Sequence, residues 1–102
     1  MSTEHLLADL ITDTTDKYTA YERRGHNHFS GDYLETLVVS RSTNKVVVHF
    51  RHWDNPAVIV DPNLGATGHA GMDWRHRPKG FRKCRDQEFV LAWVIDILHD
   101  LD

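Results

Sequence analysis

The stretch KVVVHFRHWD (residues 45–54) ends a valine-rich run with side chains that can bind or react. Successive residues of a strand point to opposite faces. One set, Val46, Val48, Phe50 and His52, is mostly apolar and is expected to face the core. The other set contains His49, Arg51 and Trp53, and Tyr33 and Glu35 are available on the neighbouring strand. We expect this second set to lie on an open sheet face, as solvated antiparallel sheets often do. Trp and Arg also dominate binding hot spots, so the face is a candidate partner surface.

The chain has eight histidines, and histidine is the commonest zinc ligand. Only His26 and His28 have chelating spacing, because residues two apart in an extended segment point the same way. His49 and His52 fall on opposite faces. No HExxH or CxxC pattern is present. We therefore expect no metal and no cofactor, and keep His26 and His28 as the candidates for a metal-dependent enzyme.

The segment DWRHRPKGFRKCR (residues 73–85, the basic segment) holds six of the twelve Lys and Arg residues. Its candidate partner-binding residues are Trp74, Arg75, Arg77, Lys79, Phe81, Arg82, Lys83 and Arg85. Such a cationic arm with two aromatic groups can bind phosphates and bases, or an acidic protein surface. The alternative is that Trp74 and Phe81 pack at the rim of the core while the cations pair with the domain's own carboxylates.

Motifs for other enzyme chemistry are missing. The glycines of NLGATGHAG lead into no helix, so they present no helix N-terminus to a phosphate. Cys84 is the only cysteine, which excludes an internal disulfide. Its neighbours Lys83 and Arg85 favour a thiolate, but an unreactive thiol explains a lone cysteine better. We expect no catalytic activity.

The length of 102 residues and a net charge of −3 indicate one globular domain with acidic helices and one basic loop. No apolar run is long enough to span a bilayer, and no secretory leader is apparent. These features predict a cytoplasmic protein without membrane contact. The Arg-over-Lys and Asp-over-Glu usage suggests a GC-rich genome, such as that of a bacterium or its phage.

The first element is predicted as a helix over 2–24. Leu6, Leu7, Leu10 and Ile11 recur at helical spacing, and Tyr18 and Tyr21 continue the stripe. Strands are predicted over 33–41 and 45–53, separated by the turn-forming sequence STNK. A third short strand, 57–61, lies between prolines. Together, residues 33–61 predict a three-stranded meander.

Residues 62–85 show no periodicity and predict a long loop, a feature that is often functional. The last element, DQEFVLAWVIDILHDLD, predicts a helix over 86–101 with Asp86 as its N-cap. Its apolar face is wide enough to be clasped in the core or shared in a homodimer. A monomeric mass in light scattering at high concentration would refute the homodimer.

The predicted fold is α+β, a single domain over 1–102 with the order α-β-β-β-α and both helices packed on one face of the sheet. Double-stranded-RNA-binding domains share this order, but they contact phosphates with a lysine-rich start of the last helix. Here that helix begins with Asp86, Gln87 and Glu88 and contains no Lys or Arg. The shared order therefore assigns no family.

The function predicted from these residues is a small non-catalytic, regulatory protein-binding module, such as a phage or bacterial accessory protein. A protein partner would engage the basic segment and the open sheet face. The first alternative is a nucleic-acid-binding protein that uses residues 74–85. The second is a His-ligated metal-dependent enzyme.

Overall fold

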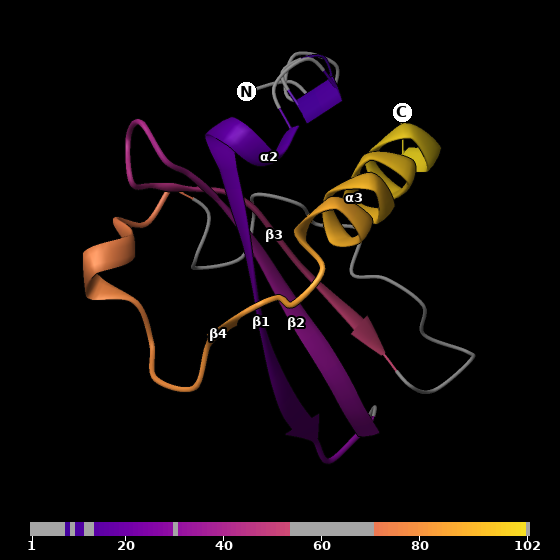
Figure 1. Cartoon of the computed structure of the whole chain (residues 1–102). Coiled ribbons are helices and arrows are strands. Elements are labelled where there is room, and N and C mark those ends of the chain that lie inside the picture. The colour runs from indigo at the N-terminus through magenta and orange to yellow at the C-terminus, as the bar shows by residue number, and fades with distance from the viewer. Residues whose placement is uncertain (1–7, 9, 12–13, 30, 54–70, 102) are drawn as a thin grey trace.

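The structure is a computed structural model of the whole chain and describes residues 8, 10–11, 14–29, 31–53 and 71–101. Its elements are helix α2 (Thr14–Lys17), strands β1 (Tyr18–Asn27), β2 (Gly31–Ser40) and β3 (Val46–Trp53), 3-10 helix η1 (Trp74–His76), strand β4 (Arg82–Lys83) and helix α3 (Gln87–Leu101). The described strands form an antiparallel sheet in the order β3-β2-β1-β4 (Figure 1). The predicted α+β class is confirmed.

The predicted helix over 2–24 is wrong from Tyr18 onward. The described residues before that point are helical, but Tyr18–Asn27 is strand β1, which pairs with β2 from Tyr18↔Ser40 to Asn27↔Gly31. The leucine stripe ends at Ile11, and the residues that seemed to extend it are threonines and tyrosines, which fit a strand better. Ten residues of cross-strand pairing outweigh the weak helix propensity of this segment.

The hairpin predicted from residues 33–41 and 45–53 is confirmed as β2 and β3. Asn44 occupies the turn with φ 57°, a left-handed conformation that asparagine tolerates. Ser40 N–H donates to the Lys45 carbonyl at 3.0 Å and closes the turn. The predicted third strand over 57–61 lies outside the described residues, so the described meander consists of β1, β2 and β3.

A β-bulge in β3 changes which residues face the helix. Val38 pairs with Val48, but Val39 pairs with Val46, so one extra residue is accommodated between them. Val46 therefore lies on the face opposite to Val48, in a cluster with Leu37, Val39 and Trp74. The expected placement of Val46 with Val48 is wrong because simple alternation does not continue through a bulge.

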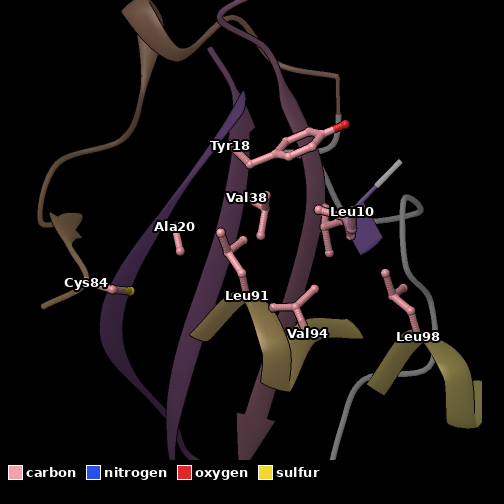
Figure 2. Close-up of a cluster of buried hydrophobic side chains, with 9 residues drawn as sticks. Leu10, Tyr18, Ala20, Val38, Cys84, Leu91, Val94 and Leu98 are labelled. Atoms are coloured by element: carbon pink, nitrogen blue, oxygen red, sulfur yellow. The ribbon is translucent and has the colours of Figure 1, made fainter. Parts of the chain in front are cut away.

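The helix predicted over 86–101 is confirmed as α3 (Gln87–Leu101). Asp86 caps it, because Asp86 Oδ1 accepts the Phe89 N–H at 2.9 Å. Leu91, Val94 and Leu98 of α3 are buried in the main core, together with Leu10, Tyr18, Ala20, Val38, Val48 and Cys84 (Figure 2). Phe89 remains 68% exposed. A homodimer through α3 stays a prediction, with Phe89 as its available apolar contact.

The sheet carries a core cluster on each face. The main core lies between the sheet and α3, and the second, Leu37, Val39, Val46 and Trp74, lies on the opposite face. The expectation that only helices pack on the sheet, leaving the other face open, is therefore wrong where residues 72–81 cover it. None of the described helices is long and apolar enough to cross a membrane.

Gln87 joins the start of α3 to the edge of β1. Its side-chain Oε1 accepts the Ala20 N–H at 2.7 Å, and its Nε2 donates to the carbonyls of Ala20 at 3.0 Å and Cys84 at 2.7 Å. The amide thus occupies the position of a strand neighbour for Ala20. It fixes the helix to the sheet where the basic segment ends.

Gln87→Glu is expected to lower the free energy of unfolding by about 2–3 kcal/mol, because a carboxylate would face two carbonyl oxygens and lose both donated hydrogen bonds. Urea denaturation at neutral pH measures the change. The matched control is Glu88→Gln at the exposed neighbouring position, which should lower the free energy of unfolding by less than about 1 kcal/mol. Equal costs for the two variants would contradict the role given to Gln87.

Candidate functional site

The beginning of the basic segment is held against the β2–β3 turn. The Trp74 N–H donates to the Asn44 carbonyl at 2.8 Å, and Lys45 forms an isolated β-bridge with Asp73. Asp73 caps η1 by accepting the Arg75 N–H at 3.0 Å. The Arg75 side chain also hydrogen-bonds to Asp73 and, with that backbone N–H, holds the pKa of the Asp73 carboxyl well below its ordinary value. The described part of the predicted loop is thus ordered by specific contacts.

Trp74 is a core residue of this protein and not an exposed anchor. It is 5% exposed, and its ring lies 4.4 Å from the Tyr21 ring and 5.7 Å from the Phe81 ring, measured between centroids. The indole packs against the apolar side chains of Leu37, Val39 and Val46 and removes them from water on this face. The expectation that Trp74 is free to stack on a partner is wrong, and the alternative in which it packs into the protein is confirmed.

The cations of the basic segment divide into two groups. Arg75 forms an ion pair with Asp73 at 2.7 Å, and Arg82 forms one with Glu22 at 3.2 Å. The remaining four lie on the surface without a carboxylate within 4.0 Å among the described residues: Arg77, Lys79, Lys83 and Arg85. Arg77 lies over the Trp74 ring, with its guanidinium carbon 5.5 Å from the centroid. Self-neutralisation therefore accounts for only part of the positive charge.

A buried ionic cluster, Arg23, Glu35, His49 and Arg51 (the Glu35 cluster), lies on the same sheet face. The cross-strand register explains it, since Glu35 pairs with Arg23 on one side and Arg51 on the other. Arg23 Nε donates to Glu35 Oε1 at 2.9 Å, and His49 Nε2 donates to Glu35 Oε2 at 2.6 Å. Arg51 Nε is 3.6 Å from Glu35 Oε2, an ion-pair distance too long for a hydrogen bond.

Glu35 remains ionised inside this cluster. Its side chain is 0% exposed, and that burial alone would raise the pKa of the carboxyl. The hydrogen bonds from His49 and Arg23 and the positive charge beside it act in the opposite direction. They outweigh the burial and lower the pKa of Glu35 from 4.5 to about 2. The carboxylate is therefore the negative centre around which the cationic groups of this face are arranged.

The aromatic ring of Tyr33 extends the cluster along the sheet. Arg51 lies over the Tyr33 ring at 4.8 Å from the centroid. The Tyr33 ring covers Gly25 on the neighbouring strand so closely that a Cβ at that position would collide with it. The prediction that His49, Arg51, Glu35 and Tyr33 share one face agrees with this arrangement. His49 itself is 1% exposed, so it does not form part of the accessible surface. The Trp53 side chain lies outside the described residues.

The basic segment and the Glu35 cluster meet at Arg23. Arg23 Nη1 donates to the Lys79 carbonyl at 3.0 Å, and its guanidinium carbon lies 4.3 Å from the Phe81 ring centroid. Arg23 thus connects Glu35 to the middle of the basic segment. The sequence analysis does not predict Arg23 as a site residue, because a helix over 2–24 does not pair it with Glu35. Reading residues 18–27 as a strand would have placed Tyr21 and Arg23 on one face.

The metal candidates His26 and His28 lie at the far end of β1 and in the following turn. Their ring centroids are 5.8 Å apart, and His26 Nδ1 is 2.6 Å from Asp32 Oδ1. Arg24, Gly25, His26 and Asp32 line a pocket there. Across the described part of the chain, no three His, Cys, Asp or Glu residues are placed to hold a metal ion.

Cys84 faces the main core (Figure 2) and is 5% exposed. Burial, together with the negative charge of Glu22, raises the pKa of its thiol to about 11, although Arg82 opposes this. The thiol is therefore protonated at neutral pH. The idea that basic neighbours activate it as a nucleophile is wrong, because strand alternation turns the sulfur inward, away from Lys83 and Arg85.

Comparison of the chain with protein-family models, curated proteins and solved structures finds no match. The functional argument consequently rests on the geometry of the basic segment and the Glu35 cluster.

Proposed function

We propose that this protein is a small non-catalytic binding module whose basic segment docks on an acidic surface of a partner protein. The observation that carries the proposal is the group of four exposed cations, Arg77, Lys79, Lys83 and Arg85, without a carboxylate partner among the described residues. They are presented on backbone that Trp74 and Arg23 hold in place. Pre-ordered charge binds with a smaller entropic cost than a mobile arm.

The Glu35 cluster has a positioning role in this proposal. Glu35 fixes Arg23, and Arg23 fixes the Lys79 carbonyl and the Phe81 ring. His49, on strand β3, donates a hydrogen bond to the second carboxylate oxygen of Glu35. The buried network therefore fixes the position of the backbone that carries the exposed cations. Arg51 has 33% of its side chain exposed and adds a further cation to the docking surface.

A protein partner is favoured over a nucleic acid. A domain that binds a duplex normally has a basic face that spans several elements, whereas half of the Lys and Arg residues here lie in one segment and the chain carries a net charge of −3. Binding of single strands uses exposed aromatic rings for stacking. The buried Trp74 does not supply one, and Phe81 is already covered by Arg23.

The proposal is tested by a pull-down from nuclease-treated lysate with three forms of the protein: wild type, Lys79→Glu/Lys83→Glu and Arg41→Glu/Lys45→Glu. The last variant changes the charge equally at the exposed β2–β3 turn. We expect wild type and the turn variant to capture the same acidic protein. For the Lys79/Lys83 variant, affinity for that purified protein should fall roughly tenfold or more, as in other interfaces with charge complementarity.

Two results would contradict the proposal. One is equal capture by the Lys79/Lys83 variant, which would remove the basic segment from the interface. The other is capture of a protein from untreated lysate that is lost from nuclease-treated lysate, which would support the nucleic-acid alternative. Matching thermal unfolding curves for all three forms would show that the substitutions act on binding and not on the fold.

A further inference from the structure

Strand β4 forms one edge of the sheet that the structure describes, and no described strand lies on its outer side. In the sheet order β3-β2-β1-β4, it pairs with β1 through Tyr21↔Lys83 and Glu22↔Arg82, and no other described strand joins it (Figure 1). Both of its residues are exposed. An exposed edge strand presents unpaired backbone groups to which another chain can add a strand.

The hydrogen-bond pattern identifies which backbone groups point outward. The Cys84 N–H donates to the Ala20 carbonyl of β1 at 3.0 Å. The backbone groups of successive residues in an antiparallel strand alternate between its two sides. Lys83, the residue before Cys84, therefore directs its N–H and carbonyl away from β1, toward the position of an added strand.

The positive charge at this edge determines which kind of added strand it favours. Lys79, Lys83 and Arg85 are exposed and have no carboxylate within 4.0 Å among the described residues. Cationic edges discourage pairing with neutral or basic strands, while opposite charges across neighbouring strands stabilise the pair. The same cations that protect the edge from non-specific pairing are thus complementary to a strand rich in Glu or Asp.

We infer that the partner engages this protein with an extended acidic segment that adds to the sheet along the outer edge of β4. Main-chain hydrogen bonds to Lys83 would fix the segment, and its carboxylates would lie against Lys79, Lys83 and Arg85. This mode of binding, β-strand addition, obtains affinity from the backbone and specificity from the side chains. The inference rests on the proposed function and specifies the partner's conformation and charge.

The test uses a short fluorescent peptide of alternating Glu and Thr, a counterpart with Lys in place of Glu, and a Glu–Thr counterpart with all backbone N–H groups methylated. Fluorescence anisotropy should show binding of the Glu–Thr peptide, and binding of the Lys and N-methylated peptides weakened roughly tenfold or more. Hydrogen exchange should show slowed exchange of the Lys83 amide when the Glu–Thr peptide is bound. Lys83→Glu should reverse the preference between the Glu and Lys peptides.

The outcomes separate this inference from the proposed function. Equal binding of the N-methylated and unmethylated Glu–Thr peptides, or an unchanged Lys83 amide, would overturn strand addition while leaving an acidic partner in place. Failure of the Glu–Thr peptide to bind, combined with capture of an acidic protein that depends on Lys79 and Lys83, would also overturn strand addition alone. If charge reversal at Lys79 and Lys83 changes neither peptide binding nor capture, both proposals are wrong.

Discussion

Glu35→Gln is expected to lower the free energy of unfolding by about 3–5 kcal/mol, the cost of removing one partner from a buried ionic network. The substitution preserves the size of the side chain but removes the negative charge that Arg23, His49 and Arg51 surround. An amide oxygen is a weaker acceptor for these groups, and the new NH2 group would face donors. Urea denaturation at neutral pH measures the loss.

The same carboxylate makes stability depend on pH in a defined direction. Its pKa is lowered from 4.5 to about 2 in the folded state. The stabilisation is therefore complete above about pH 4.5 and is lost as the pH falls through about 2. For a shift of this size it amounts to about 3 kcal/mol. The free energies of unfolding of wild type and Glu35→Gln should therefore become closer by about 3 kcal/mol as the pH is lowered from about 4.5 to below about 2.

Glu22→Gln is the matched control for Glu35. Glu22 also pairs with an arginine, but its partner Arg82 has 75% of its side chain exposed. Solvent screens such pairs, so the control should cost less than about 1 kcal/mol. If Glu35→Gln costs no more than Glu22→Gln, the Glu35 cluster is not the centre that positions Arg23.

Local sequence was sufficient for the elements whose pattern and partners are both local. The hairpin of β2 and β3 follows from two β-branched runs with the turn STNK between them, and α3 follows from Asp86 and the apolar positions after it. In these segments propensity, periodicity and end signals agree. Agreement between such levels is the condition under which sequence patterns are reliable.

The sequence was insufficient where long-range pairing determines the structure. Residues 18–27 form β1 because β2 offers ten partners, information that the segment's own composition does not contain. The strand Arg82–Lys83 is two residues long and exists only because β1 has an available edge. The bulge that turns Val46 to the opposite face likewise depends on the partner strand.

The sequence predicts most of the charged residues that form the candidate site, but it does not predict which of the site's side chains are buried. The concentration of cations in residues 73–85 and the row containing Arg51, Glu35 and Tyr33 could be read from spacing alone. That Trp74 is buried and that Arg23 joins the two regions depend on β1, which the sequence did not reveal. The same aromatic residue types mark hot spots and cores, and only the apolar neighbours Leu37 and Val39 decide between them.

Trp74→Ala is expected to lower the free energy of unfolding by about 3–5 kcal/mol, the range for deletion of a buried aromatic side chain. Trp74 packs with Leu37, Val39 and Val46, so its removal leaves a cavity on this face of the sheet. Urea denaturation measures the loss. Native-state hydrogen exchange should show faster exchange at Val46, whose N–H donates to the Met72 carbonyl at 2.9 Å. The β1–β2 amides should change less.

Phe89→Ala is the control for Trp74, because Phe89 is an aromatic residue that is 68% exposed. It should change the free energy of unfolding by no more than about 0.5 kcal/mol. A Trp74→Ala protein as stable as Phe89→Ala, with unchanged exchange at Val46, would mean that the indole does not fix the basic segment. The cations of that segment would then be mobile, and their pre-ordering, on which the proposed docking surface depends, would be lost.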